Sequence, residues 1–383
     1  MKKSSKQTPQ ILRGIVKKSN KSKGFYVDDL KYDSQYKLGK TELFKAMPGD
    51  LVEFSLTEKG WAKILKVKEE NTKEFIGKIF KRGQRLYTSP LGYEYDLKIL
   101  IREPLQKTAK DGGIGKFTMH KQPSVDALPE ANMTYLFDQD NEFNLAYEMS
   151  VTNHQLRRDW PKAVINESKQ LKEKKFDIDS VVDLRNKTFV TIDGKSAKDF
   201  DDAVLGEKDE QGNLILYVAI ADVGRYIDKG SCLDQEALER GTSVYFSQRV
   251  IPMLPEVLSN DLCSLKPNED RFCLVCKTTV DREGNLSGTS FFEAIINSKS
   301  RLTYGTVTRE VERKQFKKPY DHSLKILIEI YNRLKSNRSR RGSLELDVPT
   351  FIPKVENQKI SKFVDSPREI SHMMIEEFML AAN

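Results

Sequence analysis

The sequence has few residues that bind metal through sulfur or imidazole. Its 383 residues include only four Cys and four His. Four unevenly spaced cysteines are too few for the disulfide framework of a small secreted domain. Cys273 and Cys276 have the spacing of half a zinc site, but no second pair with ligand spacing occurs. We therefore expect both cysteines to lie in the core, on a strand.

Long apolar runs are also lacking. No stretch of 18 or more apolar residues occurs, and the lysine-rich N-terminus has no apolar segment of the kind found in signal peptides. A basic amphipathic helix that would bind a membrane surface is not evident either. With 38% hydrophobic and 31% charged residues, the sequence predicts a cytoplasmic protein that does not associate with a membrane.

Charge is unevenly distributed along the chain. Residues 1–120 contain 26 Lys and Arg against 14 Asp and Glu, a net charge of +12, so the rest carries −4 of the overall +8. Basic side chains that neutralise phosphates give affinity for nucleic acid without reading its sequence. The alternative is an ordinary solubilising surface. We expect the basic half to bind a polyanion.

The acidic residues include an unusually dense cluster. Asp193, Asp199, Asp201 and Asp202 fall within ten residues. So many carboxylates cannot all ionise side by side without a cation, because like charges raise one another's pKa. Oxygen-only ligands favour Mg²⁺ or Mn²⁺, and two such ions can bind the attacking and leaving oxygens during phosphodiester hydrolysis. The spacing does not fit a calcium-binding EF-hand loop.

The segments beside this cluster help to interpret it. An isolated acidic cluster is often a solvated loop. Here one strand-like run, 188–192, precedes the aspartates and another, 214–223, follows them. Sheet edges would hold the carboxylates in place, which favours a metal site.

The N-terminal half is predicted to be all β. From Ile11 to about Glu70, short strand-like segments are broken by turns at intervals that suit a small barrel. Phe25 and Tyr26 lie among lysines, as in oligonucleotide-binding barrels where bases stack on aromatic rings, although either ring could instead be a core residue. Residues 75–151 resemble a second, more divergent barrel in outline.

Several blocks of the C-terminal half resemble a known family. The stretch 191–204, TIDGKSAKDFDDAV, resembles the signature of the RNase II/RNase R family of 3′-to-5′ exoribonucleases. Four further blocks follow in family order, at 218–223, 240–246, 251–265 and 300–304. The similarity is close from about residue 185 to 383 and holds only in outline before that.

The resemblance implies a multidomain architecture. It comprises a basic N-terminus and a first OB or cold-shock-like barrel at 1–70, a second, divergent OB-like barrel at 71–155, a helical linker at 156–187, and a mixed α/β catalytic domain of RNase II type at 188–383.

The resemblance also implies roles for particular residues. Asp193, Asp199, Asp201 and Asp202 match the family's metal-binding carboxylates, and Asp201 is also expected to be catalytic. Tyr245 matches a tyrosine that clamps the last nucleotide beside the scissile bond.

Two residues match positions that recognise the ribose at the RNA 3′ end. They are Tyr304 and one of Glu376 or Glu377. A carboxylate that accepts a hydrogen bond from a 2′-OH would favour RNA over DNA. The implied activity is Mg²⁺-dependent hydrolysis of single-stranded RNA from the 3′ end to 5′-mononucleotides by a two-metal mechanism.

The family's catalytic domain continues beyond the equivalent of Asn383. Its later part supplies an arginine for the scissile phosphate and a third RNA-binding barrel. The resemblance therefore implies a catalytic domain that is incomplete at its C-terminus, with a separately encoded C-terminal half as one way to complete it. One alternative is a catalytically incomplete fragment that acts only as an RNA-binding protein. Another, a small-molecule phosphatase, is disfavoured by the basic N-terminal half.

The last helix is expected to begin at a capping box, Ser366-Pro-Arg-Glu369. Its apolar residues are expected to lack a packing partner. They are Met373, Met374, Phe378 and Met379.

Overall fold

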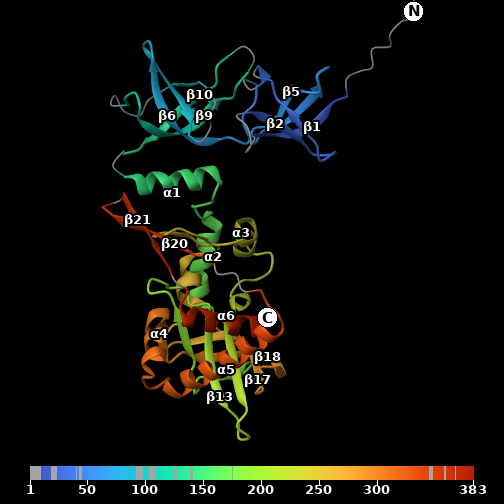
Figure 1. The fold of residues 1–383 in the computed structure, drawn as a ribbon. Coiled ribbons are helices and arrows are strands. Elements are labelled where there is room, and N and C mark those ends of the chain that lie inside the picture. The colour runs from blue at the N-terminus through green and yellow to red at the C-terminus, as the bar shows by residue number, and fades with distance from the viewer. Residues whose placement is uncertain are drawn as a thin grey trace, which may run out of the picture. The chain divides into compact units, whose positions relative to one another are not determined.

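The chain forms two compact units in the computed structural model, and Figure 1 traces its course through both. One unit comprises residues 1–156 with 354–362, and the other comprises 157–353 with 363–383. Among the described residues, no helix is both long and apolar enough to cross a membrane. The structure describes residues 10–18, 24–39, 41–42, 45–91, 98–102, 109–124, 127–138, 141–174, 176–344, 348–357, 359–366 and 368–383.

The first unit begins with a five-stranded antiparallel sheet of order β3-β2-β1-β4-β5. A parallel bridge between Leu38 and Ala62 joins its two edges. Side chains alternate between the interior and the surface along β2, as expected for a strand with one buried face. The strands are β1 Leu12–Lys18, β2 Phe25–Asp29, β3 Gln35–Lys37, β4 Leu51–Leu56 and β5 Ala62–Glu69.

A closed five-stranded barrel of order β10-β8-β7-β6-β9 follows in the same unit. Phe75 and Phe117 stack inside it with ring centroids 5.3 Å apart. The N-terminal half is thereby confirmed as rich in β structure, although residues 142–153 form a helix and not the end of a barrel. The elements are β6 Glu74–Arg82, β7 Arg85–Pro90, β8 Ile99–Ile101, β9 Ile114–Lys121, β10 Glu130–Leu136 and the helix α1 Glu142–Asn153.

The second unit is built on a mixed seven-stranded sheet of order β11-β18-β17-β14-β13-β12-β19. The pairs β11–β18 and β12–β19 are parallel, and the other neighbours are antiparallel. Both faces of the sheet are covered, which explains why β14 is an almost continuous apolar run. The strands are β11 Val182–Asp183, β12 Val190–Asp193, β13 Asp202–Lys208, β14 Leu214–Ala221, β17 Asp270–Val280, β18 Leu286–Asn297 and β19 Ser300–Thr303.

Helices pack on the two faces of this sheet. One core includes residues of α2 and α3, and the other includes residues of α4, α5 and α6 (Figure 1). Cys273 and Cys276 are buried on β17, as the sequence predicted. The helices are α2 Lys162–Gln170, α3 Cys232–Arg240, α4 Tyr304–Arg313, α5 Asp321–Arg340 and α6 Ile370–Ala382, with short turns η2 Leu171–Glu173, η3 Val223–Arg225 and η4 Leu258–Leu262.

Two small hairpins complete the fold. The pair β15–β16 is antiparallel and lies in the second unit, and β20–β21 lies in the segment before α6. Their strands are β15 Val244–Tyr245, β16 Val250–Ile251, β20 Phe351–Glu356 and β21 Lys359–Asp365.

The structure corrects two expectations about α6. The helix begins at Ile370 after Glu369 as N-cap, so the predicted capping box does not start it. Met374 and Phe378 are fully buried in a core shared with α4 and α5, and Met373 and Met379 pack against that core. The apolar face of α6 therefore has a packing partner.

The predicted linker also differs from expectation. Residues 157–187 belong to the second compact unit, and Val164 and Leu171 are buried in its core. Apolar residues on one face of α2 explain why this segment packs as part of a domain instead of acting as a free connection.

Candidate active site

The four clustered aspartates lie at one end of the β12–β13 pair. Asp193 is the last residue of β12, and Asp202 is the first residue of β13. The two strands are antiparallel neighbours, so these ends meet. The loop that joins them carries Asp199 and Asp201. The predicted support of the cluster by flanking strands is confirmed, although β13 begins within the cluster itself.

Electrostatics at this end of the sheet disfavour ionised carboxylates. Burial, followed by repulsion from Asp202, Asp199 and Asp201, raises the pKa of Asp193 to about 7. Burial and the charge of Asp201 raise the pKa of Asp202 to about 6. Desolvation and Asp199 raise the pKa of Asp201 as well. A bound cation would relieve this repulsion.

The four carboxylates are suitable metal ligands by their chemistry, but their side chains are not arranged around one common metal position. Asp193 Oδ2 is buried and has no hydrogen-bond partner. Oxygen donors of this kind are the ligands that Mg²⁺ and Mn²⁺ prefer. In the part of the chain that the structure describes, no three His, Cys, Asp or Glu side chains are grouped so as to hold one metal ion. Metal binding by the cluster therefore stays a prediction.

Arg301 on β19 holds one half of the aspartate loop. Its Nη2 donates to the carbonyl oxygens of Gly194 at 3.0 Å, Lys195 at 2.6 Å and Ala197 at 3.4 Å. Its guanidinium also lies 5.4 Å from the centre of the Phe200 ring. Sequence analysis gave Arg301 no role, although it lies in the recognised block 300–304.

Ser264 holds the other half of the loop. The Ser264 hydroxyl donates a hydrogen bond to the Lys198 carbonyl at 2.9 Å and accepts one from the Phe200 amide at 3.1 Å. Ser264 is fully buried, and the Leu265 amide donates to the Phe200 carbonyl at 2.9 Å. The backbone on both sides of Asp199 is thus fixed by a residue far away in the sequence.

Tyr245 reaches the cluster from the β15–β16 hairpin. Its hydroxyl donates to Asp199 Oδ2 at 3.1 Å, while 64% of the residue's surface is exposed. Desolvation and the charges of Asp199 and Asp201 raise the pKa of the Tyr245 phenol. The structure therefore brings Tyr245 together with Asp199 and leaves its ring accessible. Its role in clamping a nucleotide stays a prediction.

Tyr304 lies near Asp193 and Asp202. It follows β19, whose last residue Thr303 is in register with Asp193. Burial and the charges of Asp193 and Asp202 raise the pKa of Tyr304. Its ring stacks on His372 of α6 with centroids 3.9 Å apart and an interplanar angle of 22°. His372 was not identified from the sequence.

Glu376 and Glu377 are both paired with arginine. Arg338 Nη1 lies 2.7 Å from Glu377 Oε1 and 3.3 Å from Glu376 Oε1, and Arg368 also pairs with Glu376. Glu377 is buried and lines a cavity of about 550 Å³ beside Arg338 and Asn337. The predicted contact of either glutamate with ribose stays a prediction.

The first barrel presents a basic and aromatic face. Tyr26 lies opposite Lys17 on β1 and Lys37 on β3. Lys37 Nζ in turn lies 5.0 Å from the centre of the Trp61 ring. Phe25 points the other way and is only 3% exposed. The predicted RNA contact of Phe25 is wrong in this structure, because its ring fills the barrel core and cannot stack on a base.

Comparison with known families agrees with the geometry of the second unit. Residues 181–383, just over half of the chain, match the family model for the RNB domain. The chain therefore belongs to the RNB-domain family. All of the aspartates, tyrosines and glutamates discussed from Asp193 to Glu377 lie within the matched residues.

Two similar curated proteins are each named ribonuclease R. The chain is 36% identical over 330 residues to "Ribonuclease R" of Vibrio parahaemolyticus and to that of Escherichia coli. These alignments cover 84% of this chain, 39% of the Vibrio protein and 40% of the Escherichia protein. The chain thus spans about two fifths of the length of these relatives.

Solved structures share the fold. RNase R of Mycoplasma genitalium in complex with ribose-methylated single-stranded RNA superposes with a TM-score of 0.86 at 24% identity, covering 97% of this chain and 60% of that protein. Yeast Ssd1, described as a pseudonuclease, gives a TM-score of 0.61 at 14% identity, covering 96% of this chain and 53% of that protein. The likeness extends over both compact units and concerns the fold alone.

Proposed function

We propose that this chain is an RNase R-like, Mg²⁺-dependent exoribonuclease that hydrolyses single-stranded RNA from its 3′ end. The observation that carries the proposal is the group of four aspartates at the β12–β13 end, whose carboxyl pKa values are raised mainly by burial and by one another. Membership of the RNB-domain family supports the same conclusion. Mn²⁺ is the expected substitute for Mg²⁺.

The proposed reaction is hydrolysis of the terminal phosphodiester. Water adds to phosphorus, the bond from phosphorus to the 3′ oxygen of the preceding nucleotide breaks, and that oxygen takes up a proton. A 5′-mononucleotide leaves, and the RNA is one residue shorter. Two divalent ions bound by the aspartates would supply positive charge for the attacking water and for the oxygens of the scissile phosphate.

The chain's own residues would position the substrate. Asp193 and Asp202 are presented by strand ends, while Arg301 and Ser264 fix the loop that carries Asp199. Tyr245 would pack its exposed ring against the last nucleotide while its hydroxyl stays on Asp199. Tyr304, backed by His372, would contact the terminal ribose, as would Glu376 or Glu377.

The barrels would bind the RNA upstream of the site. The face formed by Lys17, Tyr26, Lys37 and Trp61 offers cations for phosphates and rings for bases. The net charge of +12 over residues 1–120 favours the same role. A separately encoded C-terminal half as partner stays a prediction.

Hydrolysis of a labelled RNA tests the proposal. A single-stranded RNA carrying a fluorophore at its 5′ end is incubated with the purified chain and Mg²⁺. We expect successive shortening from the 3′ end and release of 5′-mononucleotides, both abolished by EDTA and by Asp201→Asn.

The matched control is Asp209→Asn, which removes an equal charge from a turn where Asp209 pairs with Asn213. Wild-type chain that leaves the RNA intact contradicts the proposal as stated for this chain. Degradation that survives Asp201→Asn would assign the activity to a contaminating nuclease. RNA binding without hydrolysis would favour the RNA-binding alternative.

A further inference from the structure

Tyr245 lies on an unusually small structural element. The hairpin pairs Val244 with Ile251 and Tyr245 with Val250, and a bond from the Phe246 amide to the Arg249 carbonyl at 2.8 Å closes its turn. An isolated two-stranded hairpin is marginally stable in water. The Tyr245 side chain is largely exposed, so burial does not fix its position over Asp199. Something outside the two pairs must hold the hairpin.

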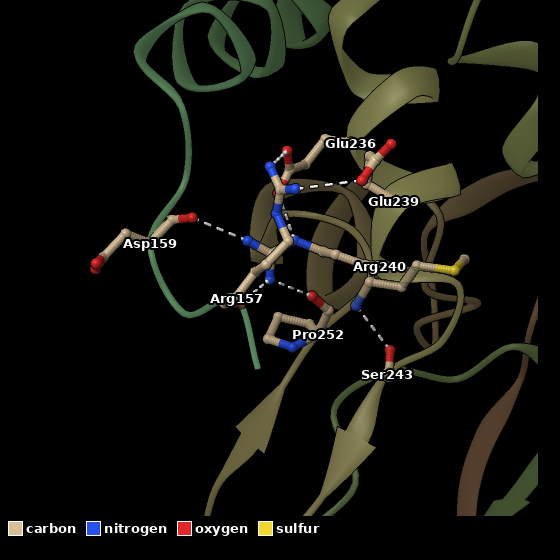
Figure 2. Close-up of polar contacts among 8 residues, drawn as sticks. Arg157, Asp159, Glu236, Glu239, Arg240, Ser243 and Pro252 are labelled. Atoms are coloured by element: carbon tan, nitrogen blue, oxygen red, sulfur yellow. Dashed lines mark hydrogen bonds and ion pairs between the residues drawn. The ribbon is translucent and has the colours of Figure 1, made fainter. Parts of the chain in front are cut away.

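Arg240 provides that support at the base of the hairpin. It is the last residue of α3, five positions before Tyr245. Its Nη1 donates to the carbonyl of Pro252, directly after β16, at 3.2 Å. Ser243 makes a second tie, because its Oγ accepts the Met253 amide at 2.9 Å. Figure 2 shows Arg240 between the helix and the hairpin.

The same guanidinium is fixed on its other sides. It donates to the carbonyls of Arg157 at 2.7 Å and Asp159 at 3.0 Å (Figure 2). It also lies 3.6 Å from the centre of the Trp160 ring. Its Nε donates to Glu236 Oε1 at 2.9 Å. A planar guanidinium can make this set of contacts at once, and an ammonium cannot.

Burial makes this arrangement rigid. The Arg240 and Glu236 side chains are only 3% and 5% exposed. Glu236 also accepts two hydrogen bonds from Arg157, at 2.8 and 3.2 Å. Four of the five N–H donors of this buried charge make hydrogen bonds. The side chain therefore has little room to move, since a broken contact leaves an unpaired buried group.

We propose that Arg240 is a positioning residue for Tyr245: it fixes the hairpin base to α3 and to residues 157–160, and so sets the tyrosine hydroxyl on Asp199. Among the described residues, the hydrogen bonds of Arg240 go to Glu236 and to the carbonyls of Arg157, Asp159 and Pro252, and not to the clustered aspartates of the candidate active site. The catalytic consequence rests on the proposed function, whereas the mechanical claim concerns the free protein.

Hydrogen exchange in the full chain tests the mechanical claim. Arg240→Met keeps an apolar stem against Trp160 and removes every donor. We expect amide exchange in residues 243–253 to accelerate on the order of tenfold or more, since hydrogen bonds from charged groups are stronger than those between neutral groups. Exchange in β13 and β14 should stay unchanged. Arg240→Lys should give a smaller acceleration at the same amides.

Arg157→Met is the matched control. It removes the other arginine from Glu236 and Glu239 while leaving the bond from Arg240 to Pro252 in place. We expect hairpin exchange in this variant to match wild type. Equal acceleration in both variants, uniform acceleration across the sheet, or no change in Arg240→Met would overturn the proposal. If Arg240→Met does not fold, hydrogen exchange in Arg240→Lys tests the proposal by the same criteria.

A double-mutant cycle on RNA hydrolysis adds the functional readout. If Arg240 acts through Tyr245, Arg240→Met should lower kcat in the wild-type background and have almost no further effect in Tyr245→Ala. Full additivity would overturn the functional part of the proposal. If the wild-type chain does not hydrolyse RNA, the proposed function fails, and hydrogen exchange alone decides the mechanical role of Arg240.

Discussion

The Tyr245 hydroxyl donates a hydrogen bond to Asp199 Oδ2 across 3.1 Å, although the residues are 46 positions apart. The contact joins the β15–β16 hairpin to the loop between β12 and β13. The hydrogen bond from the hydroxyl orients the tyrosine ring, and the ring remains exposed, so a substrate can still reach it. The contributions of the hydroxyl and of the ring to hydrolysis can therefore be measured separately, with different substitutions of Tyr245.

Tyr245→Phe should leave the stability of the free protein almost unchanged, because the side chain is exposed, and surface changes usually alter the free energy of unfolding by no more than about 0.5 kcal/mol. Hydrolysis should slow, because the ring loses the bond that orients it. Tyr245→Ala, which also removes the ring, should slow hydrolysis further. Melting temperatures and kcat for the three proteins check this order. Equal kcat in wild type and Tyr245→Ala would exclude a role for the ring.

Alanine substitutions of Phe25 and Tyr26, which are adjacent in the first barrel, should have different effects: one on stability and the other on RNA binding. Phe25→Ala should destabilise the barrel by about 3–5 kcal/mol, because it empties a buried site. Tyr26→Ala should change stability little and weaken binding of single-stranded RNA by about 1–3 kcal/mol, the usual contribution of a stacked base. Chemical denaturation and fluorescence anisotropy measure the two effects. Weakened RNA binding by a fully folded Phe25→Ala protein would contradict the assignment of Phe25 to the core.

Arg301→Met should increase the mobility of the aspartate loop, although Arg301 lies far from this loop in the sequence. The substitution removes three bonds to the carbonyls of Gly194, Lys195 and Ala197. We expect faster amide exchange in residues 194–200 and weaker metal binding. Arg301→Lys should restore little, because one ammonium cannot reproduce the guanidinium geometry. Wild-type exchange in Arg301→Met would show that the loop does not depend on this side chain.

Close packing of α5 on β13 gives a stability prediction. A Cβ on Gly206 would lie 2.9 Å from the Leu327 amide nitrogen and 2.9 Å from Ile326 Cγ2. Gly206→Ala should therefore destabilise the second unit by about 1–3 kcal/mol. Gly305→Ala is the control, since the nearest atom, Arg309 Nη1, is 4.0 Å away and the residue is helical. Denaturant midpoints that are equal in both variants would contradict the packing argument.

Local sequence patterns predicted much of the architecture. The strand-like runs around the aspartates and the small β domains are both present. These features depend on periodicity and on turn residues, which are local properties. The aspartate cluster was identified for the same reason.

Other features depend on contacts between distant parts of the chain. The bonds from Arg301 and Ser264 to the aspartate loop span more than 60 residues. No local pattern distinguishes such an arginine from a solvated one. Phe25 is a similar case, since a ring among lysines is compatible with either face of a strand. The burial of α6 likewise depends on α4 and α5, which its own sequence does not specify.

The raised carboxyl pKa values predict how stability depends on pH and metal. In the folded chain Asp193 and Asp202 have pKa values of about 7 and 6, against about 4 for an unfolded Asp. Without metal, the second unit should therefore lose stability as pH rises from about 4 to 7, since folding disfavours the ionised form. Protons also compete with metal, so Mg²⁺ should raise the melting temperature more at about pH 8 than at about pH 6. An equal rise at both values would argue against binding at these carboxylates.

Binding of Mn²⁺, followed by electron paramagnetic resonance of the full chain, tests the central claim most directly. The account predicts that the wild-type chain binds Mn²⁺, that excess Mg²⁺ displaces it, and that Asp209→Asn binds equally well. Asp201→Asn should bind far more weakly, because the group of carboxylates loses one of its charges. Equal Mn²⁺ binding by Asp201→Asn and wild type, or no binding by wild type, would contradict the assignment of Asp193, Asp199, Asp201 and Asp202 as the metal site.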